Sequence, residues 1–104
     1  MFGLFKSLFG EAIEEVREAL KQNAFLVDVR TRSEFDAGSA KGAVNIPLDK
    51  IESQLNQFQN KNGIVVFCQS GARCGQAKRI LESHGINNII NGGSLQNVKK
   101  ALND

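Results

Sequence analysis

The chain has 104 residues, of which 41% are hydrophobic and 23% are charged, and its formal net charge at pH 7 is +2. This size and composition suit one globular domain, and they exclude two domains, a disordered chain and a fold that depends on disulfides or a structural metal. The small net charge gives no support to nucleic-acid binding. Residues 37–104 nevertheless hold eight basic and four acidic residues, and a mildly positive region suits a small anionic substrate.

The first ten residues are apolar and contain Phe2, Phe5 and Phe9. No basic segment precedes them, Lys6 interrupts the run, and no small-residue cleavage site follows. The segment therefore predicts neither a signal peptide nor a membrane span. We expect a cytoplasmic protein without stable membrane association. Packing of the phenylalanines onto the protein's own sheet is the preferred interpretation, and a membrane or partner surface is the alternative.

The first predicted elements are an amphipathic helix and a buried strand. Apolar residues recur at three- and four-residue steps opposite a charged face, which predicts a helix over about 10–22. The nearly continuous apolar run at 24–29 is typical of a buried parallel strand. Thr31 and Ser33 are candidate caps for a short helical turn at 33–37.

The middle of the chain predicts two further strands. A loop bracketed by Gly38 and Gly42 leads to a short strand at 43–46, which Pro47 closes. Apolar residues at positions 48, 51, 55 and 58 have helical spacing. After a turn at 60–63, the run Ile64-Val-Val-Phe67 is the clearest strand prediction, because it is rich in β-branched residues.

The last third predicts a loop at 68–72, a helix at about 72–84 ended by Gly85, and a strand at 86–90. A turn at Gly92-Gly93 and a final helix follow, the helix marked by Leu95, Val98, Ala101 and Leu102. Alternating strands and helices predict one three-layer α/β/α domain over residues 1–104, with a small, mainly parallel sheet of four to five strands.

Cys68 directly follows the strongest predicted strand and precedes a glycine-containing loop and a helix. Ligands of open α/β sheets bind at the carboxyl ends of strands, where loop N–H groups and a helix N-terminus attract anions. A thiol there is expected to have a lowered pKa and to act as a thiolate nucleophile. We therefore predict a catalytic Cys68 rather than a buried structural cysteine. The candidate substrate-binding residues are Gln69, Ser70, Gly71, Ala72 and Arg73.

The second cysteine, Cys74, lies six residues further along, at the start of the predicted helix. One hypothesis makes it a redox partner that forms a disulfide with Cys68. We favour a small residue in the first helical turn, because residues at the two ends of a curled loop are expected to point apart. His84 is interpreted as a charge near a helix C-terminus. The cysteines and the histidine match no common zinc spacing, so neither a metal nor a cofactor is expected.

Four segments of the chain resemble the conserved segments of rhodanese-like domains. The segment Cys68-Gln-Ser-Gly-Ala-Arg73 resembles the active-site loop of that family. Leu26-Val-Asp-Val-Arg30 with Glu34-Phe35 resembles its first conserved segment, Gly42-Ala-Val-Asn-Ile-Pro47 its second, and Gly92-Gly93 its C-terminal glycine pair. The matches run in order from about residue 25 to residue 95.

The resemblance implies a rhodanese-like fold and sulfurtransferase activity. Cys68 would take a sulfane sulfur from a small anionic donor, hold it as a persulfide and pass it to a thiol or sulfur-carrier acceptor. The family often has Arg where this chain has Gln69, so the sequence leaves the donor open between thiosulfate and a persulfide. Asp28 and Arg30 are expected to form a structural ion pair and turn network, since a carboxylate base near Cys68 would raise the pKa of the thiol.

Three other functions remain as alternatives. A cysteine-dependent phosphatase uses the same kind of loop, but its loops separate Cys and Arg by five residues, whereas four separate Cys68 from Arg73. A non-catalytic interaction module and a dedicated sulfur-relay carrier are the others. We expect a monomer that binds no nucleic acid.

Overall fold

The protein is described by a computed structural model that covers residues 12–103. Its centre is a four-stranded parallel sheet in the order β2-β1-β3-β4. The strands are β1 (Phe25–Asp28), β2 (Val44–Asn45), β3 (Ile64–Cys68) and β4 (Ile89–Ser94). The side chains of β3 are all buried, as expected for a central strand with layers on both faces. The predicted parallel sheet is thus confirmed.

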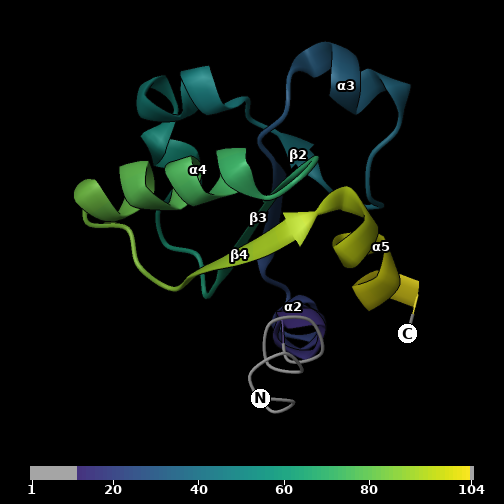
Figure 1. The fold of residues 1–104 in the computed structure, drawn as a ribbon. Helices are drawn as coiled ribbons and strands as arrows, with labels where there is room; N and C mark the ends of the chain where they lie inside the picture. The colour runs from purple at the N-terminus through teal and green to yellow at the C-terminus, as the bar shows by residue number, and fades with distance from the viewer. Residues whose placement is uncertain (1–11, 104) are drawn as a thin grey trace, which may run out of the picture.

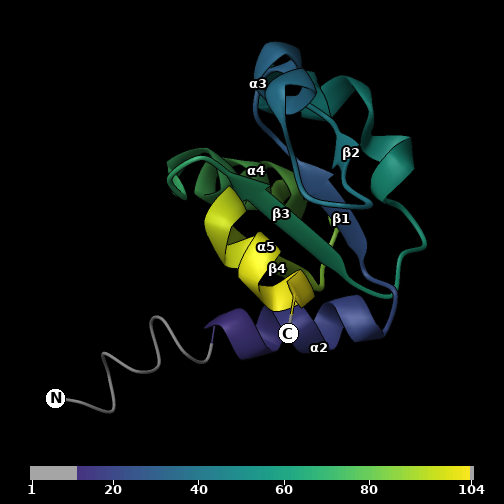
Figure 2. The same ribbon diagram turned by 90° about the vertical axis from the view of Figure 1, so that its right-hand side faces the viewer.

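Helices cover both faces of the sheet (Figures 1 and 2). Helices α2 (Ala12–Lys21) and α5 (Leu95–Asn103) pack against one face. Helix α4 (Ala72–Ser83) and the 3₁₀ segments η2 (Leu48–Ser53) and η3 (Leu55–Phe58) cover the other. These three layers confirm the predicted α/β/α architecture. The predicted start of the first helix and the three N-terminal phenylalanines lie outside the described residues.

The side chains of β3 point alternately to the two faces of the sheet, and the core accordingly forms two clusters. Val65 and Phe67 pack with Val98 on the side of α2 and α5. Ile64, Val66 and Cys68 point to the opposite side, where the core includes residues of α4. Since successive side chains of a strand point to opposite faces, this register decides that the Cys68 sulfur faces α4.

The segment 48–58 forms two short 3₁₀ segments instead of the predicted helix. Its backbone hydrogen bonds join residues three apart, such as Lys50 N–H to the Pro47 carbonyl at 2.8 Å and Gln54 N–H to the Ile51 carbonyl at 2.9 Å. Because residues three apart eclipse one another in a 3₁₀ helix, the pairs 48/51 and 55/58 keep their apolar side chains on one face. The apolar spacing alone therefore did not distinguish the two helix types.

The last strand lies three residues later than predicted and includes the glycine pair. Ile86 lies in the turn that closes the end of α4. Its N–H donates to the Leu81 carbonyl at 3.1 Å, beyond Gly85, which has a φ of +80°. A Cβ at Gly92 would lie 3.0 Å from Val65 Cγ1 and 3.1 Å from the Val66 carbonyl oxygen. Gly92 is therefore required for the contact of β4 with β3. The sequence had predicted a turn at this position.

Helix α3 (Arg32–Ala37) lies beyond the carboxyl end of β1, at the top of Figure 1. Thr31 caps it, as predicted, whereas Ser33 lies inside the helix. The Glu34 N–H donates to Thr31 Oγ1 at 3.2 Å, and Glu34 Oε1 accepts the Thr31 N–H at 3.0 Å. This reciprocal capping box fixes the Glu34 side chain as well as the helix. Among the helices of residues 12–103, none has the length and apolar character needed to cross a membrane.

Candidate active site

Cys68 is the last residue of β3, and its side chain is fully buried beneath the loop that follows. Gly71 turns this loop with a φ of +101°, a left-handed conformation that favours glycine. The turn brings the Gly71 N–H to 2.9 Å from Cys68 Sγ. Gln69, Ser70 and Ala72 are exposed around the sulfur. The loop therefore presents a buried sulfur to N–H groups of its own backbone.

The surroundings of Cys68 favour its thiolate. Burial raises the pKa of the thiol, but hydrogen bonds from the Cys74 backbone and thiol and from the Gly71 and Ser70 N–H groups act in the opposite direction. The result is a pKa below the ordinary value of a cysteine. Because hydrogen bonds to the charged form lower a pKa, the loop geometry favours the thiolate form of Cys68.

Cys74 is the third residue of α4, and its Sγ lies 3.5 Å from Cys68 Sγ. The expectation that the two cysteines point apart is therefore wrong. Gly71 curls the loop tightly enough that the first turn of α4 faces the strand end. Cys74 is also fully buried, with Sγ 2.7 Å from Asn91 Oδ1 and 3.0 Å from the Gly71 carbonyl oxygen. Burial and the neighbouring Cys68 raise the pKa of Cys74 to about 12. Both cysteines are free thiols.

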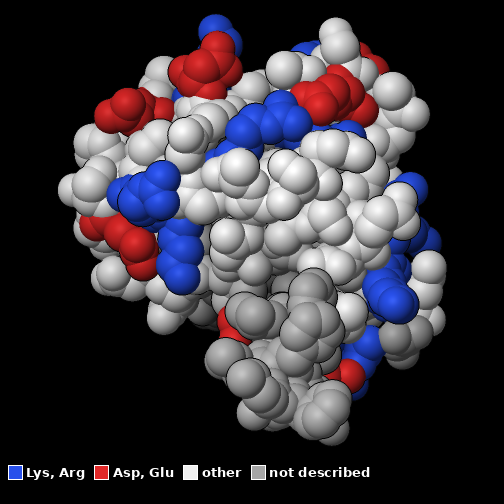
Figure 3. Space-filling model, viewed as in Figure 1, with Lys and Arg blue, Asp and Glu red and all other residues white. Residues whose placement is uncertain are grey.

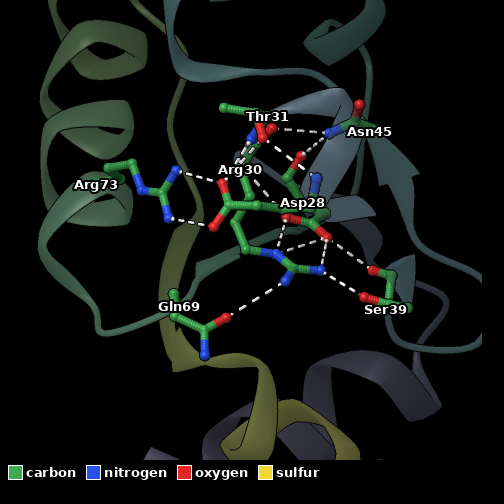
Figure 4. A network of polar contacts seen from close by, with 9 residues as sticks. Asp28, Arg30, Thr31, Ser39, Asn45, Gln69 and Arg73 are labelled. Atoms are coloured by element: carbon green, nitrogen blue, oxygen red, sulfur yellow. Dashed lines mark hydrogen bonds and ion pairs between the residues drawn. The ribbon is translucent and has the colours of Figure 1, made fainter. Parts of the chain in front are cut away.

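Arg73 forms a two-pronged ion pair with Glu34 of α3 (Figure 4). Arg73 Nη1 donates to Glu34 Oε1 at 2.7 Å, and Nη2 donates to Oε2 at 3.0 Å. These bonds and the Thr31 N–H lower the pKa of Glu34 to about 2. Glu34 is thus an anion held in place by two partners, and the guanidinium of Arg73 is directed toward α3.

Asp28 and Arg30 form a second, buried ion pair that closes the carboxyl end of β1 (Figure 4). Arg30 Nη2 donates to Asp28 Oδ2 at 2.7 Å and to the Gly38 carbonyl at 2.8 Å. Ser39 Oγ donates to the same Asp28 oxygen at 2.7 Å. Arg30 Nη1 also donates to Gln69 Oε1 at 3.3 Å, which joins this network to the cysteine loop. The contacts place Asp28 in the predicted ion pair and turn network and leave it no access to a reacting proton.

The one histidine of the chain lies away from the cysteine loop. His84 ends α4, at the opposite end from Cys74, and its Nε2 lies 3.2 Å from Glu52 Oε2. Over residues 12–103, no group of three or more His, Cys, Asp or Glu side chains is arranged to hold a metal ion.

Sequence reasoning missed the partners of Arg73 and Cys74. Glu34 was noted only within a family segment, although the pattern Thr31-x-x-Glu34 is a capping-box signal that would have fixed its position. No local signal identifies Asn91, because its contact with Cys74 depends on the pairing of β3 with β4.

A family model and several known proteins are similar to this chain. The model of the family described as "Rhodanese-like domain" matches residues 12–101. The uncharacterized protein YqhL of Bacillus subtilis is 35% identical over 78 residues, which cover 75% of this chain and 62% of YqhL. Thiosulfate sulfurtransferase PspE of Escherichia coli is 34% identical over 74 residues, which cover 69% of this chain and 71% of PspE.

A solved structure shares the fold. The human single-domain sulfurtransferase TSTD1 superimposes with a TM-score of 0.61 at 33% identity, covering 73% of this chain and 80% of TSTD1. Other relatives are much longer than this chain. A tRNA uridine(34) hydroxylase of Hamiltonella defensa is 31% identical over 84% of this chain, which spans only 27% of that enzyme.

Proposed function

The chain belongs to the family of rhodanese-like domains, and on that premise we propose that it is a sulfurtransferase that carries sulfur as a persulfide on Cys68. The observation that carries the proposal is the position of Cys68 Sγ, buried at the end of β3 with the Gly71 N–H at 2.9 Å. The lowered pKa of Cys68 favours its thiolate form. A thiolate is the form of cysteine that attacks sulfur.

The proposed cycle has two half-reactions. The Cys68 thiolate attacks the outer, sulfane sulfur of the donor, a sulfur–sulfur bond forms, and the donor's own sulfur–sulfur bond breaks. With thiosulfate the leaving group is sulfite, and the enzyme keeps Cys68–S–S⁻. A thiolate acceptor then attacks the outer sulfur and leaves with it, which returns Cys68 as a thiolate. Such covalent catalysis predicts ping-pong kinetics.

The loop residues have separate parts in this proposal. The N–H groups of residues 69–73 stabilise the negative persulfide, as oxyanion-hole donors stabilise an oxyanion. Gly71 provides the turn that aims its N–H group at the sulfur. Gln69, Ser70 and Ala72 form the exposed rim that a donor meets. Arg73 orients the loop through its ion pair with Glu34.

The ion pair of Arg73 argues against the phosphatase alternative. A phosphatase of this kind needs its loop arginine free to contact the transferred phosphoryl group. Here both terminal nitrogens of Arg73 donate to Glu34. The short loop and the paired guanidinium therefore favour transfer of a single sulfur atom over phosphoryl transfer.

Intact mass spectrometry tests the proposal directly. The wild-type protein is incubated with thiosulfate or with a low-molecular-weight persulfide, and Cys68→Ser is treated in parallel. A gain of one sulfur in the wild type, absent from Cys68→Ser, is the expected result. No sulfur gain with either donor, or hydrolysis of p-nitrophenyl phosphate that depends on Cys68, would overturn it.

A further inference from the structure

Both guanidinium groups near the cysteine loop are neutralised by carboxylates. Arg73 is paired with Glu34 through two hydrogen bonds, and Arg30 is paired with Asp28 in the protein interior. The loop sequence from Cys68 to Arg73 contains no other basic residue. The guanidinium group that belongs to the loop and the one that contacts Gln69 are therefore both neutralised by carboxylates.

The Arg73–Glu34 pair is held in place from both sides. Glu34 Oε1 also accepts hydrogen bonds from the Thr31 N–H at 3.0 Å and the Thr31 hydroxyl at 3.1 Å. Both side chains of the pair are 34% exposed, so a soluble donor can approach the pair from solvent. To contact a donor directly, Arg73 would have to break its two charge-assisted hydrogen bonds to Glu34. The Glu34 carboxylate would then remain near the donor without its arginine partner.

Charge on the visible surface agrees with this description. Along the upper part of the face in Figure 3, basic side chains lie beside acidic ones, and the middle of the face is uncharged. A site of this kind offers little attraction to a dianion. Because electrostatic energy scales with the charge of the ligand, a carboxylate at the rim opposes a dianion twice as strongly as a monoanion.

We propose that Glu34 sets the charge selectivity of the site: by neutralising Arg73, it favours monoanionic sulfane donors, such as persulfides and thiosulfonates, over dianionic thiosulfate. The proposal rests on the proposed sulfur transfer at Cys68 and specifies its donor class. Glu34 touches neither Cys68 nor the loop backbone in the contacts described above, and it acts through Arg73 as a specificity-determining residue.

Two donors that differ by one charge isolate this effect. Thiosulfate transfers its sulfane sulfur to the Cys68 thiolate and releases sulfite. Methanethiosulfonate, CH₃SO₂S⁻, transfers the same sulfur and releases methanesulfinate, and in both reactions one sulfur–sulfur bond forms and one breaks. Cyanide then removes the sulfur as thiocyanate, which is measured for both donors. The ratio of their kcat/KM values reports charge selectivity and cancels any general loss of activity.

Glu34→Gln is the test variant, because glutamine also fits the third position of a capping box and removes only the charge. Its Oε1 can keep the bonds to Thr31, whereas its NH₂ group cannot accept from Arg73. Asp36→Asn is the matched control, since Asp36 lies on the same helix and pairs with the exposed Arg32 at 2.9 Å. Both variants change the net charge by the same amount.

We expect the thiosulfate-to-thiosulfonate ratio to rise about threefold to tenfold in Glu34→Gln. It should stay at the wild-type value in Asp36→Asn. Thiosulfate turnover by Glu34→Gln should also fall more steeply with added salt than that of the wild type. The double variant Glu34→Gln with Arg73→Gln removes both charges of the pair and should return the ratio toward the wild-type value.

Two results would overturn the inference, and they are distinguishable. If both donors add sulfur to Cys68 but the ratio in Glu34→Gln does not rise, Glu34 does not set charge selectivity, while the proposed function stands. If neither of these donors nor a low-molecular-weight persulfide adds sulfur to Cys68, the proposed function fails and the inference fails with it. Thermal unfolding of each variant confirms that the ratios are measured on folded protein.

Discussion

Cys68 and Cys74 are equally buried and lie 3.5 Å apart, yet their pKa values move in opposite directions. The difference lies in what surrounds each sulfur. Cys68 faces donors, among them the Gly71 N–H. Cys74 faces acceptors, namely the Asn91 side-chain oxygen and the Gly71 and Gly93 carbonyls. Burial raises the pKa of both thiols, so the hydrogen-bond donors around Cys68 and the presence of Cys68 beside Cys74 decide which thiol ionises first.

The two sulfurs also influence each other. A thiolate at Cys68 raises the pKa of Cys74, and the Cys74 thiol supplies a hydrogen bond that lowers the pKa of Cys68. Only one negative charge is thus stable in the pair near neutral pH. Substitutions that change Cys68, Cys74 or the loop around them one at a time test this difference between the two thiols.

The largest expected effect comes from replacing one of the two cysteines by serine, and the comparison needs each of them in turn. Cys68→Ser should reduce sulfur transfer to background, because no thiolate remains to carry the persulfide. Cys74→Ser should retain most of the activity, because serine still offers a donor at that position. Thiocyanate formation with methanethiosulfonate as donor measures both. Equal losses in the two variants would contradict the division of roles.

The next effect is expected from Gly71→Ala. A Cβ there would meet no atom within 4 Å, but the φ of +101° is strained for alanine. The left-handed region costs alanine about 1–2 kcal/mol, so the loop should relax and move its N–H away from Cys68. The pKa of Cys68 should then rise, and its alkylation by iodoacetamide at pH 7 should slow by about tenfold.

The pH dependence of Cys68 alkylation shows in which direction Gly71→Ala moves the pKa of Cys68. Alkylation of Cys68 should be constant above its pKa and fall as the pH drops through it, and the fall should begin at higher pH in Gly71→Ala. Each profile is best recorded in a Cys74→Ser background. In the converse Cys68→Ser protein, Cys74 should resist alkylation through neutral pH. Superimposable profiles with and without the Gly71→Ala substitution would show that this N–H does not control ionisation.

The smallest expected effect is a partial disulfide between the two cysteines. Peroxide converts the Cys68 thiolate to a sulfenic acid, and Cys74 then displaces water to form the bond. The 3.5 Å separation favours this step, whereas the raised pKa of Cys74 slows it. Peptide mass spectrometry should find a 68–74 disulfide in the wild type and further oxidation of Cys68 in Cys74→Ser. Without that disulfide, Cys74 has no resolving role.

The sequence predicted most of the fold because the strands and helices have strong local patterns. The side chains of residues 64–67 are all apolar and point alternately to two covered faces, which is the pattern of a central strand. The segment 48–58 was mispredicted because the same apolar spacing suits two helix types. The strand at 89–94 was mispredicted because the contact of Gly92 with Val65 of β3 lies outside the segment.

The position of the loop between β3 and α4 was predictable from the sequence, but its electrostatics were not. A strand, Cys68, Gly71 and a helix follow one another in sequence, so their geometry is local. The partner of Arg73 comes from α3, 39 positions earlier in the chain. The sequence placed Arg73 among the candidate substrate-binding residues, and the tertiary contact with Glu34 is what neutralises its charge.

Glu34 serves the helix cap and the ion pair with the same carboxylate. Most replacements of Glu34 would therefore change the donor preference and destabilise α3 together. A descendant of this protein would rarely acquire a new donor through substitution of Glu34. Glutamine is the exception, because it keeps the cap and drops the charge. Under selection for thiosulfate use, we expect the Glu-to-Gln codon change, one nucleotide away, to be among the first substitutions recovered.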